Sequence, residues 1–141
     1  MTLREPRLVI AGRPARRDHL HGAWWPYSRD IECELAPMLT MVGTRFRTVF
    51  GVALSRVDWP SGPLARHLAG PATITWDDWL EPHLAVLYCG RRIRIALLVL
   101  PPDMPEEIAL TATLMAVAPG NNRTPSQTLA RAREQATASP G

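Results

Sequence analysis

The sequence predicts a single small domain of the α+β class, with a mostly antiparallel sheet of three to five strands and two or three helices. Segments with the alternating pattern of strands are grouped between residues 45 and 102, and segments with helical spacing lie on both sides of this group. Strands grouped in sequence pair mainly with their neighbours, which favours an antiparallel sheet. The length of 141 residues and the hydrophobic fraction of 46% are typical of one ordinary globular domain.

The first helix is expected just after residue 28, because apolar residues recur at helical spacing from Ile31 to Val42. Ser28 is a suitable N-cap for it. Pro37 interrupts the pattern, since a proline inside a helix removes one hydrogen bond and clashes with the preceding turn. Two alternatives follow: a helix from Ser28 that kinks at Pro37, or a helix that begins near Glu34 with Pro37 in its first turn.

Strands are expected in the middle of the chain. Arg45–Asp58 alternates and predicts a long strand. Its shared face would carry Phe46, Thr48, Phe50, Val52 and Leu54. Gly70–Trp76 predicts a second strand, and Leu84–Pro102 predicts two strands joined near Gly90. The continuous apolar run Ile95–Leu100 is typical of a central strand.

Two helices are expected near the C-terminus. Asp103 and Glu106 have the spacing of a capping box for the first. Its buried stripe is expected to consist of Leu110, Leu114 and Val117. Thr124 and Gln127 form a second box, with Pro125 at the first helical position, and predict where the last helix begins.

The expected organisation is an N-terminal arm or edge strand over residues 1–20, one domain over 21–135 and a flexible tail over 136–141. The apolar run near the N-terminus is too short for a signal peptide or a membrane span. Cys33 and Cys89 lie far apart and form no dense disulfide framework, so both are expected as reduced thiols. These observations predict a cytoplasmic protein with no membrane partner.

The basic residues are all arginine, 16 of them, and the net charge is +3. GC-rich codon usage accounts for the missing lysine, and selection for phosphate-binding guanidinium groups is the alternative. Two arginine clusters are candidates for binding nucleic acid: Arg13, Arg16, Arg17, Arg91, Arg92 and Arg94. With Trp24 or Trp25 nearby they would form a stacking platform for single strands. The other interpretation is solvated loop and edge charge.

The segment HGAWWPYSRD, residues 21–30, is the main candidate for a binding site. Indole rings stack on flat or cationic ligands, and a guanidinium group binds phosphate or carboxylate. The alternative is a corner that fastens a loop to the core, with one indole inside and the other outside. The candidate residues for a ligand or partner are Trp24, Trp25, Ser28, Arg29, Asp30 and Trp59.

Metal, cofactor and catalytic sites are not expected. The possible metal ligands show no recognisable spacing: His19, His21, His67, His83, Cys33 and Cys89. No glycine-rich phosphate loop, G-x-S-x-G or H-E-x-x-H motif is present. Asp77, Asp78 and Glu81 lie beside Trp76 and Trp79, where an indole would raise the pKa of a carboxyl group enough for acid catalysis. Exposed loop carboxylates are the more ordinary interpretation.

Four segments resemble a family of small actinobacterial proteins of unknown function: HGAWWPYSRDIECEL, VDW, RRIRIALLVLPPD and APGN. The resemblance covers roughly residues 21–129 and implies a small cytoplasmic single-domain protein without an assigned activity. By this resemblance, the signature positions are Gly22, Ala23, Trp24, Trp25, Pro26, Ser28, Arg29, Asp30, Trp59, Pro101, Pro102 and Asp103. Met104 stands where the family usually has threonine, which affects only the cap of the following helix.

The function predicted from these observations is a non-enzymatic binding or regulatory module. It would act through the Trp/Arg corner on a protein partner or a small ligand. Weak binding of RNA or DNA through the arginine clusters is the alternative.

Overall fold

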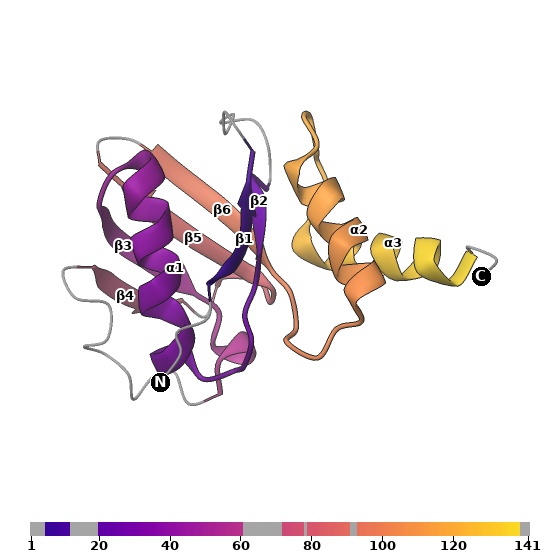
Figure 1. Ribbon diagram of the computed structural model, residues 1–141, viewed down its shortest axis with the longest axis horizontal. Coiled ribbons are helices and arrows are strands. Elements are labelled where there is room, and N and C mark those ends of the chain that lie inside the picture. Colours follow the sequence, from indigo (N-terminus) through magenta and orange to yellow (C-terminus); the bar gives the residue numbers. More distant parts are fainter. Residues whose placement is uncertain (1–4, 12–19, 61–71, 78, 91–92, 139–141) are drawn as a thin grey trace.

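The computed structural model describes residues 5–11, 20–60, 72–77, 79–90 and 93–138. Within them the chain forms six strands, three α-helices and one turn of 3-10 helix at Arg56–Asp58 (Figure 1). The elements are, in order, β1 (Arg7–Ile10), β2 (Gly22–Trp25), α1 (Ile31–Phe46), β3 (Val49–Leu54), β4 (Thr73–Trp76), β5 (Leu84–Cys89), β6 (Ile93–Val99), α2 (Glu106–Val117) and α3 (Pro125–Ala138). The α+β class is confirmed, and the sheet has one strand more than the upper limit expected from the sequence.

The six strands form one mixed sheet in the order β1-β2-β6-β5-β3-β4. β2 pairs with β6 and β3 pairs with β4 in parallel, and the other neighbours are antiparallel. β2, β3, β4 and β6 therefore run in one direction and end at one side of the sheet, which we call the carboxyl edge. The segments that follow these strands meet there although they are far apart in sequence.

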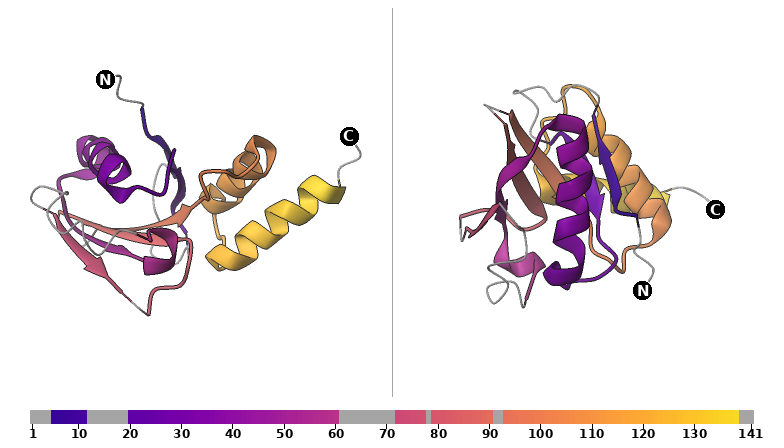
Figure 2. Two further views of the ribbon diagram at one scale, coloured as in Figure 1. Left: turned by 90° about the horizontal axis from the view of Figure 1, so that it is seen from below. Right: turned by 60° about the vertical axis from the view of Figure 1, so that its left-hand side comes forward.

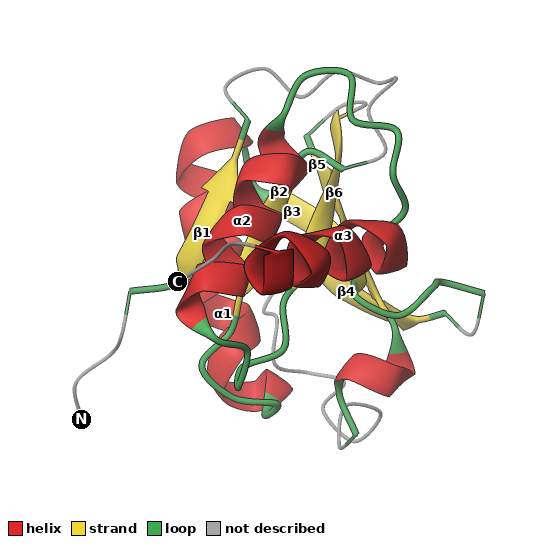
Figure 3. Ribbon diagram, turned by 90° about the vertical axis from the view of Figure 1, so that its right-hand side faces the viewer, coloured by secondary structure: helices red, strands yellow, loops and turns green. Residues whose placement is uncertain are grey.

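The sheet has a helix layer on each face (Figure 2). α1 packs on one face with Leu35, Met38 and Val42, all of which are buried. α2 packs on the other face over β2, and α3 packs against α2 (Figure 3). None of the helices in the described part of the chain has the length and the apolar character needed to cross a membrane.

The buried face of α2 differs from the prediction. Its buried residues are Ala109, Ala112 and Ala116, whereas Leu110 and Leu114 are 55% and 70% exposed. The predicted leucine stripe is therefore wrong. Alanine has no side chain beyond Cβ, so an alanine face lets the helix backbone approach its neighbours closely, and this contact decides which face of α2 is buried.

The cap of α2 also differs from the prediction. Pro105 occupies the N-cap position and makes no side-chain cap hydrogen bond. The expected capping box of Asp103 and Glu106 is absent, because α2 begins only at Glu106. The box at Thr124 is confirmed: the Gln127 N–H donates to Thr124 Oγ1 at 3.1 Å, and the Thr124 N–H donates to Gln127 Oε1 at 2.9 Å.

α1 begins at neither of the two positions expected for it. Asp30 is the N-cap, and its carboxylate accepts the Glu32 N–H at 3.0 Å. Ser28 lies before the helix, where its hydroxyl donates to Glu34 Oε2 at 3.0 Å. Pro37 lies inside the helix. A proline has no N–H, so one hydrogen bond of the helix is missing there. The packing of the buried apolar stripe against the sheet compensates for this loss and keeps the helix continuous.

The long strand expected over Arg45–Asp58 is shorter than predicted, because Arg45 and Phe46 end α1. A register shift between Val49 and Gly51 then changes the alternation within β3. Phe50 consequently lies on the surface and does not share a face with Val52.

Candidate functional site

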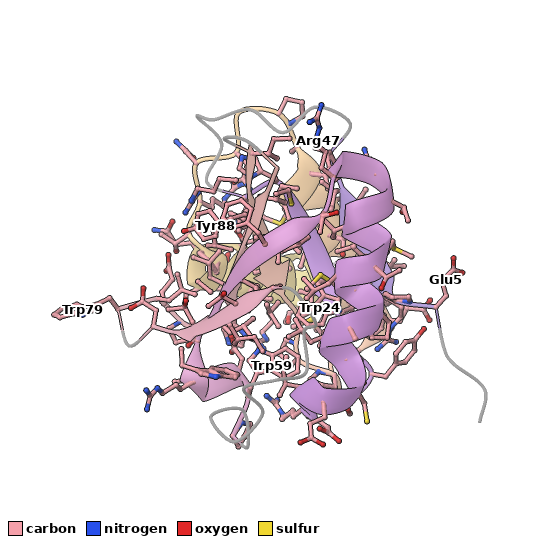
Figure 4. The ribbon with its side chains drawn as sticks, turned by 90° about the vertical axis from the view of Figure 1, so that its left-hand side faces the viewer. Glu5, Trp24, Arg47, Trp59, Trp79 and Tyr88 are labelled. Carbon is pink, nitrogen blue, oxygen red and sulfur yellow. The ribbon has the colours of Figure 1, made fainter. Side chains whose placement is uncertain are left out.

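The two neighbouring tryptophans of β2 have different surroundings. Trp24 packs in the core on the α1 side and is 1% exposed. Its ring stacks on Trp59 with centroids 5.2 Å apart and planes at 30° (Figure 4). Trp25 is only partly buried and packs against the core on the α2 side. Successive residues of a strand point to opposite faces, so strand formation by GAWW explains this division.

The Trp25 side chain is held in place by a hydrogen bond and a cation–π contact. Its Nε1–H donates to the Pro101 carbonyl at 3.0 Å. The Arg7 guanidinium lies 3.8 Å from the centroid of the Trp25 ring and 4.1 Å from that of Tyr27. Arg7 also donates to the carbonyls of Trp25 and Pro26, both at 2.9 Å. Trp25 therefore joins β1 to the segment after β6.

A pocket opens beside this corner, at the carboxyl edge. Its volume is about 200 Å³, including solvent space at its open mouth, and its enclosed part has room for roughly one water molecule. Its walls come from the segments after β2, β3 and β6 and from the start of β5. They consist of Pro26, Ser28, Arg29, Asp58, Trp59, His83, Val99, Leu100, Pro101 and Pro102. We refer to it as the edge pocket.

Buried Asp58 and partly exposed His83 form a polar pair in the wall of the edge pocket. Asp58 is 5% exposed, and its two oxygens accept the His83 backbone N–H at 3.1 and 2.8 Å. The imidazole Nδ1 lies 3.7 Å from Asp58 Oδ1 and 3.2 Å from the Val99 carbonyl oxygen. A carbonyl oxygen only accepts, so the Val99 contact is a hydrogen bond when the proton is on Nδ1.

His83 has a left-handed backbone, with φ of 67°. Few residues other than glycine adopt this conformation, and it persists where the surroundings hold it. Asp58 binds the His83 N–H, and the His83 carbonyl accepts the Val99 N–H at 2.8 Å. These bonds fix His83 at the point where the chain enters β5.

Burial raises the pKa of the Asp58 carboxyl, because the charged form loses hydration. The His83 imidazole, the His83 backbone N–H and the Arg29 guanidinium act in the opposite direction but do not outweigh burial. A partly desolvated carboxylate is a strong acceptor for a ligand's N–H or O–H group.

Arg29 contributes a cationic group to the edge pocket. It is about half exposed and lies 3.7 Å from Asp103, whose side chain is 86% exposed. A surface ion pair of this kind contributes little to stability, so it does not prevent Arg29 from binding an anionic ligand group.

Trp59, which lines the edge pocket, carries a hydrogen-bond donor that is unpaired in the described part of the chain. Its Nε1 atom is buried and has no hydrogen-bond partner among the described residues. Buried N–H groups are nearly always paired in folded proteins. An acceptor atom in the edge pocket, from a ligand or a water molecule, would satisfy this donor if it came within reach.

The residues singled out in the sequence are therefore divided by the fold. Ser28, Arg29 and Trp59 line the edge pocket. Trp24 stacks beneath Trp59, Trp25 is fastened to Pro101, and Asp30 caps α1.

Asp58 is a site residue that the sequence did not indicate, and the sequence indicated His83 only as a possible metal ligand. A signal for Asp58 exists, because it lies directly before Trp59 in the VDW segment after a strand. His83 gives no comparable local signal.

The carboxylates around Trp79 form no buried acid site among the described residues. Trp79 is 95% exposed, so its indole does not shield a carboxyl group from water. Asp77 accepts the Trp79 backbone N–H at 2.8 Å, and Glu81 is exposed. Asp78 lies outside the described residues.

The arginine clusters are described only at Arg94, which is exposed on β6. The other five members lie outside the described residues: Arg13, Arg16, Arg17, Arg91 and Arg92.

The cysteines and histidines form no group of three potential metal ligands in the part of the chain that is described; His19 and His67 lie outside it. A hydrogen bond to Asp30 raises the pKa of the Cys33 thiol, and burial raises the pKa of the Cys89 thiol. Neither thiol is therefore activated as a thiolate nucleophile. His21 is buried, and its Nδ1 accepts the Ala96 N–H at 3.0 Å.

The fold and the edge pocket define a small α+β protein with one mixed sheet and a polar pocket at the carboxyl edge. The chain belongs to a family of unknown function (DUF5994), whose model matches residues 7–118. This confirms that the chain is a member of a family without an assigned activity. No curated protein and no solved structure matches it.

Proposed function

We propose that this protein is a non-enzymatic binding module and that the edge pocket is its binding site. The observation that carries the proposal is the meeting of Arg29, Asp58, Trp59 and His83, from three separate parts of the chain, around one small opening. The ligand is a small molecule, or the tip of a side chain of a protein partner, because the edge pocket is too small for more.

The chemistry of the edge pocket supports a ligand with two kinds of polar group. Asp58 would accept a hydrogen bond from a cationic or hydroxyl group. Arg29, at the exposed side, would bind a carboxylate or phosphate group. Trp59 adds an apolar wall, and its buried N–H donor would be satisfied by a ligand acceptor that reached it.

The proposed setting is the cytoplasm of an actinobacterium. Support comes from the free thiols of Cys33 and Cys89 and from the use of arginine as the only strongly basic residue, which is typical of GC-rich genomes.

The test is native mass spectrometry of the protein purified gently from its own kind of host, followed by pull-down of partners. Both experiments compare the wild type with two variants of the edge pocket and one control variant. Arg29→Ala and Asp58→Asn are expected to lose a bound molecule or partner. Loss of one charge-assisted hydrogen bond weakens binding by roughly tenfold or more. Arg133→Ala, which removes an exposed arginine of α3, is the matched control and is expected to bind as the wild type does.

Two results would count against the proposal. One is a molecule or partner that the wild type, Arg29→Ala and Asp58→Asn bind equally well. The other is a wild-type protein that captures no ligand or partner at all from its host.

A further inference from the structure

One face of the sheet is only partly covered. α2 contacts chiefly β2, with smaller contacts to β1 and β6, and α3 packs mainly on α2. Among the described residues, no helix therefore lies over the parts of β3, β4 and β5 farthest from α2 on this side (Figure 2). α1 covers the opposite face.

Cross-strand register identifies the residues of this uncovered area. Thr73 lies opposite Gly51, Gly51 opposite Tyr88, and Tyr88 opposite Arg94. Residues directly opposite one another in a sheet point to the same face. Thr73, Tyr88 and Arg94 are exposed. We call this row, together with Phe50, the open sheet face.

Two aromatic rings lie side by side on the open sheet face. Phe50 is 54% and Tyr88 is 39% exposed, and their ring centroids are 6.3 Å apart with planes at 36°. Tyr88 occupies the space that Gly51 leaves: a Cβ added at Gly51 would lie 3.5 Å from Tyr88 Cδ2. Tyr88 also lies on the side of the sheet away from α1 (Figure 4). Exposed aromatic rings grouped in this way commonly mark a binding surface.

The surroundings of the two rings favour an anionic partner. Arg94 is the cross-strand neighbour of Tyr88, and no described residue of the row is acidic. In the next row of the same face Thr75 is exposed, whereas Ala53 and Val86 are buried in the core on the α2 side, so this row also presents no carboxylate. The exposed threonines at its margin give it no continuous apolar groove for a helix of a protein partner.

We propose that the open sheet face binds single-stranded nucleic acid. Bases stack on Phe50 and Tyr88, and a backbone phosphate pairs with Arg94. A duplex binds less well, because the faces of its bases are already stacked on one another. The site is separate from the edge pocket and uses other residues.

Fluorescence anisotropy with a labelled oligothymidine or oligouridine of roughly 12 nucleotides tests the proposal. Tyr88→Ala and Phe50→Ala are each expected to weaken binding about 5- to 100-fold, and Tyr88→Phe is expected to retain it. Arg94→Ala is expected to reduce the slope of log affinity against log salt by about 0.7. Leu114→Ala removes an exposed apolar side chain of α2 and is the control expected to leave binding unchanged.

The proposal is overturned if the wild type does not bind either oligonucleotide at low salt, or if Tyr88→Ala binds as well as Tyr88→Phe. Equal binding of a duplex of the same sequence would also exclude base stacking. Formation of a dimer through the same aromatic residues, without oligonucleotide binding, would assign the open sheet face to a second copy of the chain. Arg29→Ala is expected to keep oligonucleotide binding, so this test is independent of the edge pocket.

Discussion

Truncation of the two adjacent tryptophans is predicted to have unequal effects on stability. Trp24 is almost fully buried and stacks on Trp59, whereas Trp25 is partly exposed and fastened by one hydrogen bond and one cation–π contact. Trp24→Ala and Trp25→Ala therefore remove the same atoms from neighbouring positions in two different environments. Comparison of the two variants therefore separates the contribution of core packing to the free energy of unfolding from the contribution of a surface contact.

The magnitudes follow from these contacts. Loss of a buried tryptophan costs about 3–5 kcal/mol, and loss of its aromatic partner adds about 1 kcal/mol, so Trp24→Ala should lower the free energy of unfolding by about 4–6 kcal/mol. For Trp25→Ala the hydrogen bond and the Arg7 contact contribute about 2 kcal/mol together, and partial burial adds roughly 1 kcal/mol. The expected difference between the two variants is about 2 kcal/mol.

The assay is urea unfolding followed by far-UV circular dichroism, because tryptophan fluorescence changes with the substitutions themselves. A domain of this size is stable by about 5–15 kcal/mol, so Trp24→Ala is accompanied by the milder Trp24→Phe, expected to cost about 1–2 kcal/mol. Trp25→Phe should cost about 1 kcal/mol, since it loses mainly the bond to Pro101. Equal losses for Trp24→Ala and Trp25→Ala, or a larger loss at Trp25, would refute the reasoning.

Two further predictions concern Asp58 and Gly22. The raised pKa of Asp58 means that the folded protein holds this proton more tightly than the unfolded chain. The resulting stability is present at pH values below 3.8, the ordinary pKa of an aspartate. It is lost as the pH rises through the higher pKa that Asp58 has in the folded protein. The unfolding free energy of the wild type should therefore fall relative to Asp58→Asn as the pH rises above 3.8, and a difference independent of pH would contradict this. Gly22→Ala places a Cβ against the Val9 carbonyl of β1 and should cost about 1–3 kcal/mol in urea unfolding. Gly43→Ala in α1, where a Cβ meets nothing closer than 3.9 Å, should stabilise by about 0.5–1 kcal/mol, and equal losses at both glycines would argue against the close approach of β1.

Elements defined by local signals could be predicted from the sequence. The last helix begins at the predicted box of Thr124 and Gln127 because both partners lie within one turn. The strand β2 was not predicted, because GAWW has too few residues for a clear alternation. It becomes a strand through pairing with β1 and with β6, whose partner residues lie about 75 positions away in the sequence.

The candidate site also contains some residues that local sequence signals indicate and others that only the fold brings together. Ser28, Arg29 and Trp59 could be proposed because their residue types and neighbours are unusual in sequence. Asp58 and His83 could not be paired, since their contact depends on the antiparallel register of β3 and β5, which brings the end of one strand to the start of the other. The exposed pair of Phe50 and Tyr88 depends on the same register and on the shift within β3.

The walls of the edge pocket come from residues 26, 28–29, 58–59, 83 and 99–102, so the pocket forms only when β2, β6, β5 and β3 are assembled. Partial unfolding that detaches β2 from β6 would destroy it. A ligand bound there would therefore contact segments next to the four central strands, and its binding would be coupled to the folding of that part of the sheet. At a free concentration of about 100 times its Kd, such a ligand would add about 2.7 kcal/mol to the free energy of unfolding. Thermal stability would then report occupancy of the site before the identity of the ligand is known.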